Sequence, residues 1–294
     1  MAPALVGNHG PSVNAGEGRN FWKMTGSGND FVFFDARANR SAADPLENVV
    51  DITAICAPHL GVGADGVVFI SDSAEADFAI RYYNADGSRA ALCGNASLCA
   101  AQSAVRLGLT VRDRMFHFMS DAGLIAASVD GEGTATVRLA PVTALERDAA
   151  EGLAPPESRV GYAVVGVPHL ILLVADVAAI DVARRGRILR YGPARAPAGA
   201  NVNFVSAGNL AGEWRIRTYE RGVEAETYAC GTGAIAAAAC LLAWDLAPKD
   251  AAVRLRTASG KTLSVRLPQD ANAGYSELSG EGRVVYDGTL QALR

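Results

Sequence analysis

Two stretches of the chain share one pattern of apolar and polar positions. Residues 78–84 read FAIRYYN and residues 214–220 read WRIRTYE, so an aromatic residue, Ile, Arg and Tyr recur at the same offsets. Their content of β-branched and aromatic residues predicts a strand in each stretch. A turn follows both strands, at residues 85–88 and 221–222. The pattern therefore predicts the same strand and turn twice.

Each predicted turn leads to a Cys-Gly pair and then to an alanine-rich segment. The pairs are Cys93-Gly94 and Cys230-Gly231, and the segments that follow, 96–107 and 233–246, have high helix propensity. The sequence therefore predicts one helix in each half of the chain, beginning just after a cysteine.

The ends of these two helices also carry signals. Asn95 and Thr232 are residue types that favour the N-cap position. Gly108 and Pro248 are typical of the residues that follow a helix, so we expect the helices to end near them.

Two further landmarks repeat in the same order along the chain. Residues 28–34 parallel residues 167–173, and residues 65–69 parallel residues 201–205. Four repeats in one order indicate an ancient duplication. The fold class that we predict is α+β, with two pseudo-symmetric lobes, each a mostly antiparallel, barrel-like sheet wrapped around a central helix.

The domain boundaries follow from the same pattern. We expect a first lobe made of residues 20–139 together with 281–294, and a second lobe made of residues 140–280. Residues 1–19 are rich in Gly, Asn, Ala and Pro without periodicity, and we interpret them as a disordered leader.

Composition excludes several classes of protein. Of 294 residues, 50% are hydrophobic and 20% charged, which is typical of a globular protein. The formal net charge of −4 argues against a nucleic-acid partner. The longest apolar runs are shorter than the roughly 18 residues that a membrane span needs. Without a recognisable secretory signal, we expect a cytoplasmic location and no membrane partner.

The cysteine and lysine contents bear on cofactors. An odd number of cysteines without a C-x-x-C spacing indicates reduced thiols and no zinc site. None of the three lysines lies in a recognisable pyridoxal phosphate loop, so we expect neither metal nor cofactor. The five cysteines are Cys56, Cys93, Cys99, Cys230 and Cys240.

Two cysteines at helix starts suggest a specific chemistry. A helix N-terminus presents unpaired N–H groups and the positive end of a dipole, so it binds anions and lowers the pKa of a nearby thiol. Two such ends face to face could hold a carboxylate, with one sulfur on each side of the adjacent carbon. One thiolate would remove the α-proton and the opposite thiol would deliver another. The backbone N–H groups that would hold the carboxylate belong to Gly94, Asn95, Gly231 and Thr232.

Packing is the competing interpretation, because cysteine is among the most buried residue types. It suits Cys56, Cys99 and Cys240, the last two of which fall inside the predicted helices. Cys93 and Cys230 differ because each precedes a Gly at a helix start and because they match each other.

The motifs around these residues resemble those of the diaminopimelate epimerase family, cofactor-independent enzymes that interconvert LL- and meso-diaminopimelate on the route to lysine and peptidoglycan. The resemblance extends over almost the whole chain from Phe21. It implies two lobes that close on the substrate, usually in a homodimer. The motifs that carry it are Lys23-Met24, 28–31 (GNDF), 61–66 (GVGADG), 84–88 (NADGS), Cys93-Gly94-Asn95, Pro168-His169, 201–204 (NVNF), 220–222 (ERG) and 229–234 (ACGTGA).

The resemblance also implies roles for individual residues. Cys93 and Cys230 would be the two acid/base residues, and His169 and Glu220 would lie beside the thiols and tune them. Glu220 would also contact substrate. The residues that match family positions binding the polar groups of the substrate are Asn29, Asn84, Asn201 and Arg221. An Arg fork suits the distal carboxylate, and Asn amides supply both donors and acceptors.

Purely structural interpretations of the same residues compete with these roles. Asn also favours turns, which applies to Asn84 and Asn201. Arg221 could form a surface ion pair, and a His beside a Pro is more often structural.

The chain departs from the family pattern in four places. Val167 stands where an Asn is usual before Pro-His, and Ala96 and Leu98 replace a usual Gly and Arg. One extra residue lies within 223–226, and Gly66 stands where some relatives have Gln. These departures leave the two thiols intact but bear on substrate preference.

Three other functions compete with this one. A proline or hydroxyproline racemase also uses two cysteines, but its substrate has no second amino-acid end for Arg221 to bind. A phenazine-pathway isomerase shares the duplicated fold but lacks the cysteine pair. A redox protein would use a disulfide between Cys93 and Cys230, which we interpret as a liability of the enzyme.

Overall fold

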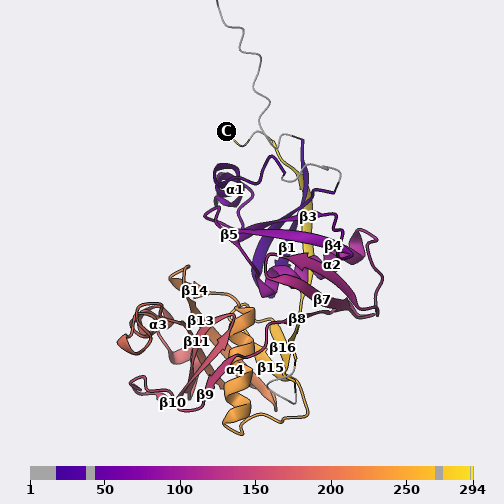
Figure 1. Ribbon diagram of the computed structural model, residues 1–294. Coiled ribbons are helices and arrows are strands. Elements are labelled where there is room, and N and C mark those ends of the chain that lie inside the picture. The colour runs from indigo at the N-terminus through magenta and orange to yellow at the C-terminus, as the bar shows by residue number, and fades with distance from the viewer. Residues whose placement is uncertain (1–17, 38–43, 269–273, 292, 294) are drawn as a thin grey trace, which may run out of the picture.

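The structure is a computed structural model that describes residues 18–37, 44–268, 274–291 and 293. Two lobes lie one above the other in Figure 1, the first in indigo to magenta and the second in pink to orange. Nearly all of the expected leader, residues 1–17, lies outside the described residues.

The first lobe is built on a mixed sheet that wraps around helix α2 (Gly94–Arg106). A second helix, α1 (Val49–Cys56), covers a smaller apolar cluster on the outer face of this sheet. The strands of this lobe before the crossover are β1 (Asn20–Gly26), β2 (Asn29–Asp35), β3 (Gly66–Ser71), β4 (Phe78–Asn84), β5 (Arg89–Ala90), β6 (Phe116–Ser120), β7 (Gly123–Val129) and β8 (Ala135–Leu139).

The second lobe repeats this plan around helix α4 (Gly231–Ala243). Helix α3 (Val182–Arg190) covers its outer cluster, and two 3₁₀ turns lie nearby at Val177–Ala179 and Pro193–Arg195. Its strands are β9 (Ala144–Glu146), β10 (Glu157–Val165), β11 (Val167–Val174), β12 (Asn201–Ala207), β13 (Glu213–Glu220), β14 (Ala225–Thr227), β15 (Val253–Arg256), β16 (Thr262–Arg266) and β17 (Ser276–Gly280).

The strand pairing confirms the duplicated fold class. In the first lobe β2 pairs parallel with β3 and β4 pairs parallel with β6, while the neighbouring pairs are antiparallel. In the second lobe β11 and β12, and β13 and β15, form the matching parallel pairs. The central helix follows β5 in the first lobe and its counterpart β14 in the second. The internal repeat seen in the sequence is therefore a repeat of topology.

Two connections tie the lobes into one molecule. β8 pairs antiparallel with β17, so the two sheets are continuous. The last strand, β18 (Gly282–Thr289), leaves the second lobe and pairs antiparallel with β1, as the yellow strand near the C-terminus shows in Figure 1. The largest buried cluster includes residues from both central helices, so the helices form the core of the molecule.

The predicted helix caps were wrong by two residues. Cys93 and Cys230 themselves are the N-caps, with extended backbones at φ −131° and −128°, so the helices begin at Gly94 and Gly231. Residues Asn95 and Thr232 lie inside the first turn. The cap of α4 is held by a sulfur, since Cys230 Sγ accepts from the Gly233 N–H, a bond that residue preferences did not suggest.

The second helix also ends earlier than expected. The helix α4 stops at Ala243 with Trp244 as its C-cap, four residues before Pro248. Asp245 takes a left-handed conformation at φ 59°, and the Trp244 indole donates a hydrogen bond of 2.7 Å to the Arg147 carbonyl. This indole contact and the turn at Asp245 accompany the end of the helix before the proline is reached.

Candidate active site

The N-termini of the two central helices meet at the junction of the lobes. A Cβ atom placed on Gly94 would lie 3.4 Å from the Cα of Gly231, and one on Gly231 would lie 3.3 Å from the Cα of Gly94. Such Cβ contacts would be unusually tight, so glycine at both positions favours the close approach of the two backbones. The unpaired N–H groups of both first turns therefore lie near each other.

Both cap cysteines are reduced and largely buried. Cys230 is 9% exposed, and its Sγ accepts from the Gly233 N–H at 3.4 Å and lies 3.6 Å from Thr232 Oγ1. The Cys93 thiol interacts with the backbone N–H groups of Ala96 and Asn95. Each sulfur thus lies over the start of its own helix.

Burial outweighs the helix N-terminus in setting the thiol pKa values. Burial raises the pKa of Cys93 to about 11, although the N–H groups of Ala96 and Asn95 oppose the shift. It raises the pKa of Cys230 as well, and the charge of Glu220 acts in the same direction on both thiols. The expectation of lowered thiol pKa values was therefore wrong, because desolvation disfavours a thiolate more than the helix favours it.

Glu220 lies at the end of β13, within electrostatic reach of both thiols. Its carboxylate accepts a hydrogen bond of 2.9 Å from Thr227 Oγ1. Burial, with a smaller contribution from Asp65, raises the pKa of Glu220. A carboxylate with a raised pKa is a better proton acceptor than an exposed one.

His169, on β11, is fully buried and neutral. Burial, assisted by the charge of Arg221, lowers its pKa to about 3. Its Nδ1 lies 3.3 Å from Asn203 Nδ2, whose amide oxygen accepts from Thr218 Oγ1 at 2.9 Å. These bonds orient the imidazole and place the proton on Nε2. Among the described residues Nε2 has no hydrogen-bond partner.

The His169–Asn203 pair lies beside Cys230. A Cβ on Gly233 would lie 2.4 Å from Asn203 Oδ1 and 3.2 Å from Cys230 Sγ. Residue 233 must therefore be glycine for the amide and the sulfur to share this space.

Asn95 bridges the two lobes from inside the first turn of α2. It is 2% exposed, and its Nδ2 donates to the Ala229 carbonyl at 3.1 Å and to Asn29 Oδ1 at 3.4 Å. Its Oδ1 is buried and unpaired within the described part of the chain. Unpaired buried atoms on Asn95 and His169 are typical of a site that a polar ligand completes.

Asn201 and Arg221 lie together in the second lobe. Asn201 is 4% exposed, and its Oδ1 accepts from the Arg221 N–H at 2.7 Å. The Arg221 guanidinium has only a long contact of 3.5 Å to the Ala198 carbonyl and forms no ion pair with any described residue. The Asn201 amide therefore holds the backbone of Arg221, whose charge is left without a counterion.

Asn84 is the candidate whose side chain bonds within its own turn. Its Nδ2 donates to Ser88 Oγ at 3.0 Å, which is the turn chemistry that asparagine favours. Its backbone pairs with Gly66, at the start of β3.

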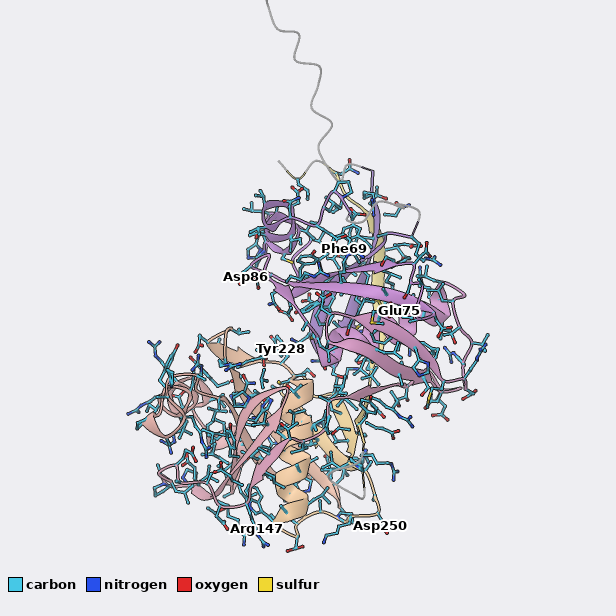
Figure 2. All side chains as sticks on the ribbon, in the orientation of Figure 1. Phe69, Glu75, Asp86, Arg147, Tyr228 and Asp250 are labelled. Carbon is cyan, nitrogen blue, oxygen red and sulfur yellow. The ribbon has the colours of Figure 1, made fainter. Side chains whose placement is uncertain are left out.

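Some residues at the junction were not predicted from the sequence. Ser259, in the loop between β15 and β16, donates to the carbonyl of Ser27 in the first lobe at 2.6 Å. Tyr228 lies at the edge of the second lobe that faces the first, as Figure 2 shows. Position 27 lies between the strand β1 and the matched motif 28–31, and that neighbourhood was the available clue.

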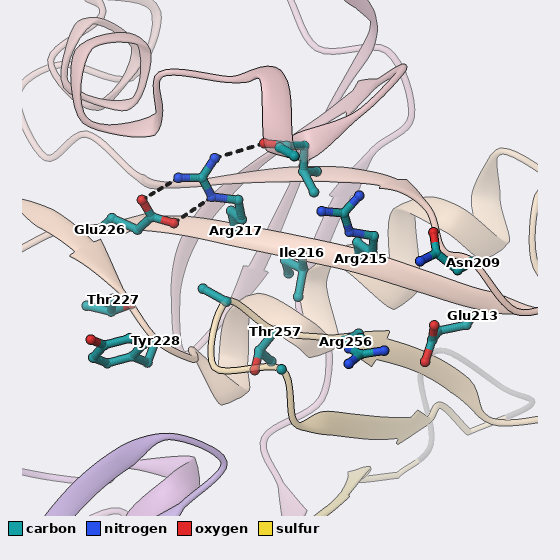
Figure 3. Close-up of a pocket in the computed structure, with 14 residues that line it drawn as sticks. Asn209, Glu213, Arg215, Ile216, Arg217, Glu226, Thr227, Tyr228, Arg256 and Thr257 are labelled. Carbon is teal, nitrogen blue, oxygen red and sulfur yellow. Dashed lines mark hydrogen bonds and ion pairs between the residues drawn. The ribbon is translucent and has the colours of Figure 1, made fainter.

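A separate hollow of about 830 Å³ lies on the second lobe, beside β13 (Figure 3). It contains neither cysteine of the pair. Arg217 in its wall is neutralised by Glu226 at 2.7 Å, and Arg215 by Asp176 at 2.8 Å. We therefore place the candidate site at the helix junction and not in this hollow.

No helix of the described residues has the length and apolarity to cross a membrane. No group of three His, Cys, Asp or Glu side chains there is arranged to hold a metal ion.

Comparison with known proteins separates fold from family. A phenazine biosynthesis protein from Bacillus anthracis has a TM-score of 0.72 at 14% identity, covering 92% of this chain and 98% of its own. A hydroxyproline epimerase from Agrobacterium vitis has a TM-score of 0.64 at 16% identity, covering 93% of both chains. At such identities these matches establish a shared fold.

The family is established by sequence. A protein of Gemmatimonas aurantiaca named diaminopimelate epimerase is 45% identical over 283 residues, which cover 93% of this chain and all of the relative. The family model described as diaminopimelate epimerase matches twice, at residues 21–145 and 161–285, once for each half of the duplication. The chain is therefore a member of the diaminopimelate epimerase family.

Proposed function

We propose that this protein interconverts LL- and meso-diaminopimelate by a two-cysteine, two-base proton transfer without a cofactor. The epimerase activity follows from membership of the family. The observation that supports the mechanism is the meeting of two helix N-termini, each capped by a cysteine and each beginning with a glycine.

The substrate's α-carboxylate would lie over the first turns of α2 and α4. The backbone N–H groups of Gly94, Asn95, Gly231 and Thr232 have no helical acceptors. The Asn95 N–H also interacts with the Cys93 thiol, so the carboxylate would share it with that sulfur. As the α C–H bond breaks, its electron pair moves onto the carboxylate oxygens. Donors that are already in place stabilise that charge, by about 2.7–4 kcal/mol each in comparable sites.

Proton transfer would run between the two sulfurs. One thiolate takes the α-proton from one face of the carbon, and the opposite thiol gives its own proton to the other face. Because burial raises the pKa of both thiols, the first thiolate forms only when a neighbouring base takes its proton. Glu220 is the base at hand, because neutral His169 presents its Nε2–H as a donor. The substrate's ammonium group adds a favourable positive charge.

The distal end of the substrate would be bound by the second lobe and by Asn84. The Arg221 guanidinium has no counterion among the described residues and suits a carboxylate. Asn29, Asn84 and Asn201 would supply the remaining polar contacts or hold the residues that make them. Val167 offers no such contact, which makes the distal end the place where substrate preference would differ.

We also propose a cytoplasmic homodimer. The family resemblance implies the dimer, and strand β18 leaves Val285 48% and Tyr286 45% exposed on an outer strand. Light scattering of the purified protein would give twice the monomer mass of 30.5 kDa. A monomer at all concentrations would contradict this part of the proposal.

The function is tested by incubating the purified, dialysed protein with LL-diaminopimelate and, separately, with L-proline and trans-4-hydroxy-L-proline, each with a chelator and without pyridoxal phosphate. Chiral chromatography should show meso-diaminopimelate in the first reaction and unchanged substrate in the others. Turnover of proline or hydroxyproline with none of diaminopimelate would replace the proposal by a proline racemase-like activity.

A further inference from the structure

The space beside Gly66 is occupied by the phenol ring of Tyr82. A Cβ atom on Gly66 would lie 2.6 Å from Cε2 and 3.1 Å from the hydroxyl oxygen of Tyr82, and 2.5 Å from the Tyr83 carbonyl. No side chain fits at position 66 while this ring is present. The departure from the family pattern at Gly66 is therefore matched by a phenol in the same place.

The ring of Tyr82 is held firmly. Tyr82 lies in β4, opposite Val68 of β3 and Ala90 of β5, and is 8% exposed. Phe31 packs against it edge to face, with ring centroids 6.0 Å apart and an interplanar angle of 78°. A ring fixed in this way holds its hydroxyl at a defined position without further loss of entropy when a ligand binds.

The hydroxyl of Tyr82 has no hydrogen-bond partner among the described residues, yet it is not one of their fully buried unpaired atoms. It therefore keeps some accessible surface. The acidic groups that act on it are Cys93, Asp65, Glu220 and Cys56. Burial, with these groups, raises its pKa well above the usual value, so the phenol stays neutral.

The loop that carries Asp65 is fixed against β2. The N–H of Asp65 donates to Asp30 Oδ1 at 3.0 Å, and the N–H of Asp30 donates to Asp65 Oδ2 at 3.1 Å. Buried Lys23 contacts the Gly63 carbonyl and pairs with Asp30 at 2.6 Å. Asp65 and Gly66 are thus held in place beside the phenol.

A neutral oxygen with a free lone pair, near two carboxylates and a thiol, is complementary to a positively charged donor. An amino-acid substrate brings such a donor as its ammonium group. A carboxylate at the same point would be repelled by Asp65 and Glu220.

We propose that Tyr82 is a substrate-binding residue whose hydroxyl oxygen accepts a hydrogen bond from an ammonium group of the substrate, beside the Glu220 carboxylate. The inference rests on the proposed function. It adds a polar contact from Tyr82, in the space that a longer side chain at position 66 would occupy. Tyr82 would thereby help to determine which amino acids the site accepts.

The variant Tyr82→Phe tests this proposal, with Tyr83→Phe as its matched control. Tyr83 is the next residue of β4, and its hydroxyl donates to Glu47 at 3.0 Å, away from the cysteines. We expect Tyr82→Phe to raise KM for diaminopimelate about tenfold, with kcat changed less than threefold and Tm unchanged. Tyr83→Phe should leave KM unchanged and lower Tm.

Pimelate separates the ammonium contact from a general disturbance of the site. It has the same seven-carbon dicarboxylate chain but no ammonium group, so its inhibition constant should be equal in wild type and Tyr82→Phe. An unchanged KM, or equal weakening of pimelate and diaminopimelate binding, would overturn the proposal. A shifted kcat–pH profile with unchanged KM would also overturn it, because the hydroxyl would then act on the Cys93 thiolate. Wild-type protein inactive on diaminopimelate would overturn the proposed function and this inference together.

Discussion

The Ser259 hydroxyl of the second lobe donates a hydrogen bond of 2.6 Å to the Ser27 carbonyl of the first. Next to Ser27, Gly28 has φ 111°, and a Cβ there would lie 2.2 Å from the Cβ of Ser259. Contact between the lobes thus depends on the absence of one side chain. With the Asn95–Ala229 bond, it brings the two helix N-termini together.

The variant Gly28→Ala should therefore hold the lobes apart. The added methyl group collides with Ser259, and the separated cysteines can no longer reach one α-carbon. We expect kcat/KM to fall at least 100-fold, and small-angle scattering with substrate to give a larger radius of gyration than wild type.

Gly212→Ala is the control for backbone strain. Gly212 also has a positive φ, 73°, but a Cβ there meets no atom within 4 Å. It should lose some stability while keeping kcat/KM within threefold of wild type. Equal losses of activity in the two variants would contradict a role for the Ser27–Ser259 contact in closure.

Buried His169 should make stability depend on pH. Its folded pKa, about 3, lies below the ordinary 6.5, so the unfolded chain binds the extra proton as pH falls through 6.5. Its neutral form therefore supports folding fully above pH 6.5, and that support is lost progressively between pH 6.5 and 3.

Urea unfolding at pH 4.5–7.5 measures this effect. The free energy of unfolding of wild type relative to His169→Gln should fall with decreasing pH, by at most about 1.4 kcal/mol per unit. His117→Gln, an exposed position, should run parallel to wild type. If the free energy of unfolding of His169→Gln also ran parallel to that of wild type over this pH range, the imidazole would not be held neutral.

The free charge of Arg221 makes a prediction about substrate. Arg221→Ala should lower kcat/KM for diaminopimelate about 100-fold, mostly through KM, because a charge-assisted contact with the distal carboxylate is lost. Arg215→Ala, which removes a surface partner of Asp176, should change neither parameter by more than twofold. Unaltered kinetics of Arg221→Ala would remove the distal-carboxylate role.

Much of the fold could be predicted because the duplication repeats each sequence pattern that indicates a strand or a helix. The strands at 78–84 and 214–220, and the two alanine-rich helices, repeat with the same neighbours, so each supports the other. The helix N-caps could not be predicted, because a cysteine sulfur rarely caps a helix. Asn and Thr, the residue types at positions 95 and 232, are preferred as N-caps.

The pKa values of the site residues were harder to predict than which residues form the site. The thiol pKa values depend on how deeply Cys93 and Cys230 are buried once the lobes meet, which local sequence does not record. Tyr82 could not be predicted as a site residue for a related reason. Its relation to Gly66 is a contact between neighbouring strands, and the residue pattern of β4 assigns it only to the core.

The central claim is that two sulfurs act on opposite faces of one C–H bond, and hydrogen exchange at the α-carbon tests it most directly. In heavy water, wild type should epimerise LL-diaminopimelate with one deuterium at the inverted carbon. Cys99→Ala and Cys240→Ala, which change buried core thiols, should do the same. Cys93→Ala and Cys230→Ala should each give no epimerised, deuterated product, and full epimerisation by either one would contradict the two-base mechanism.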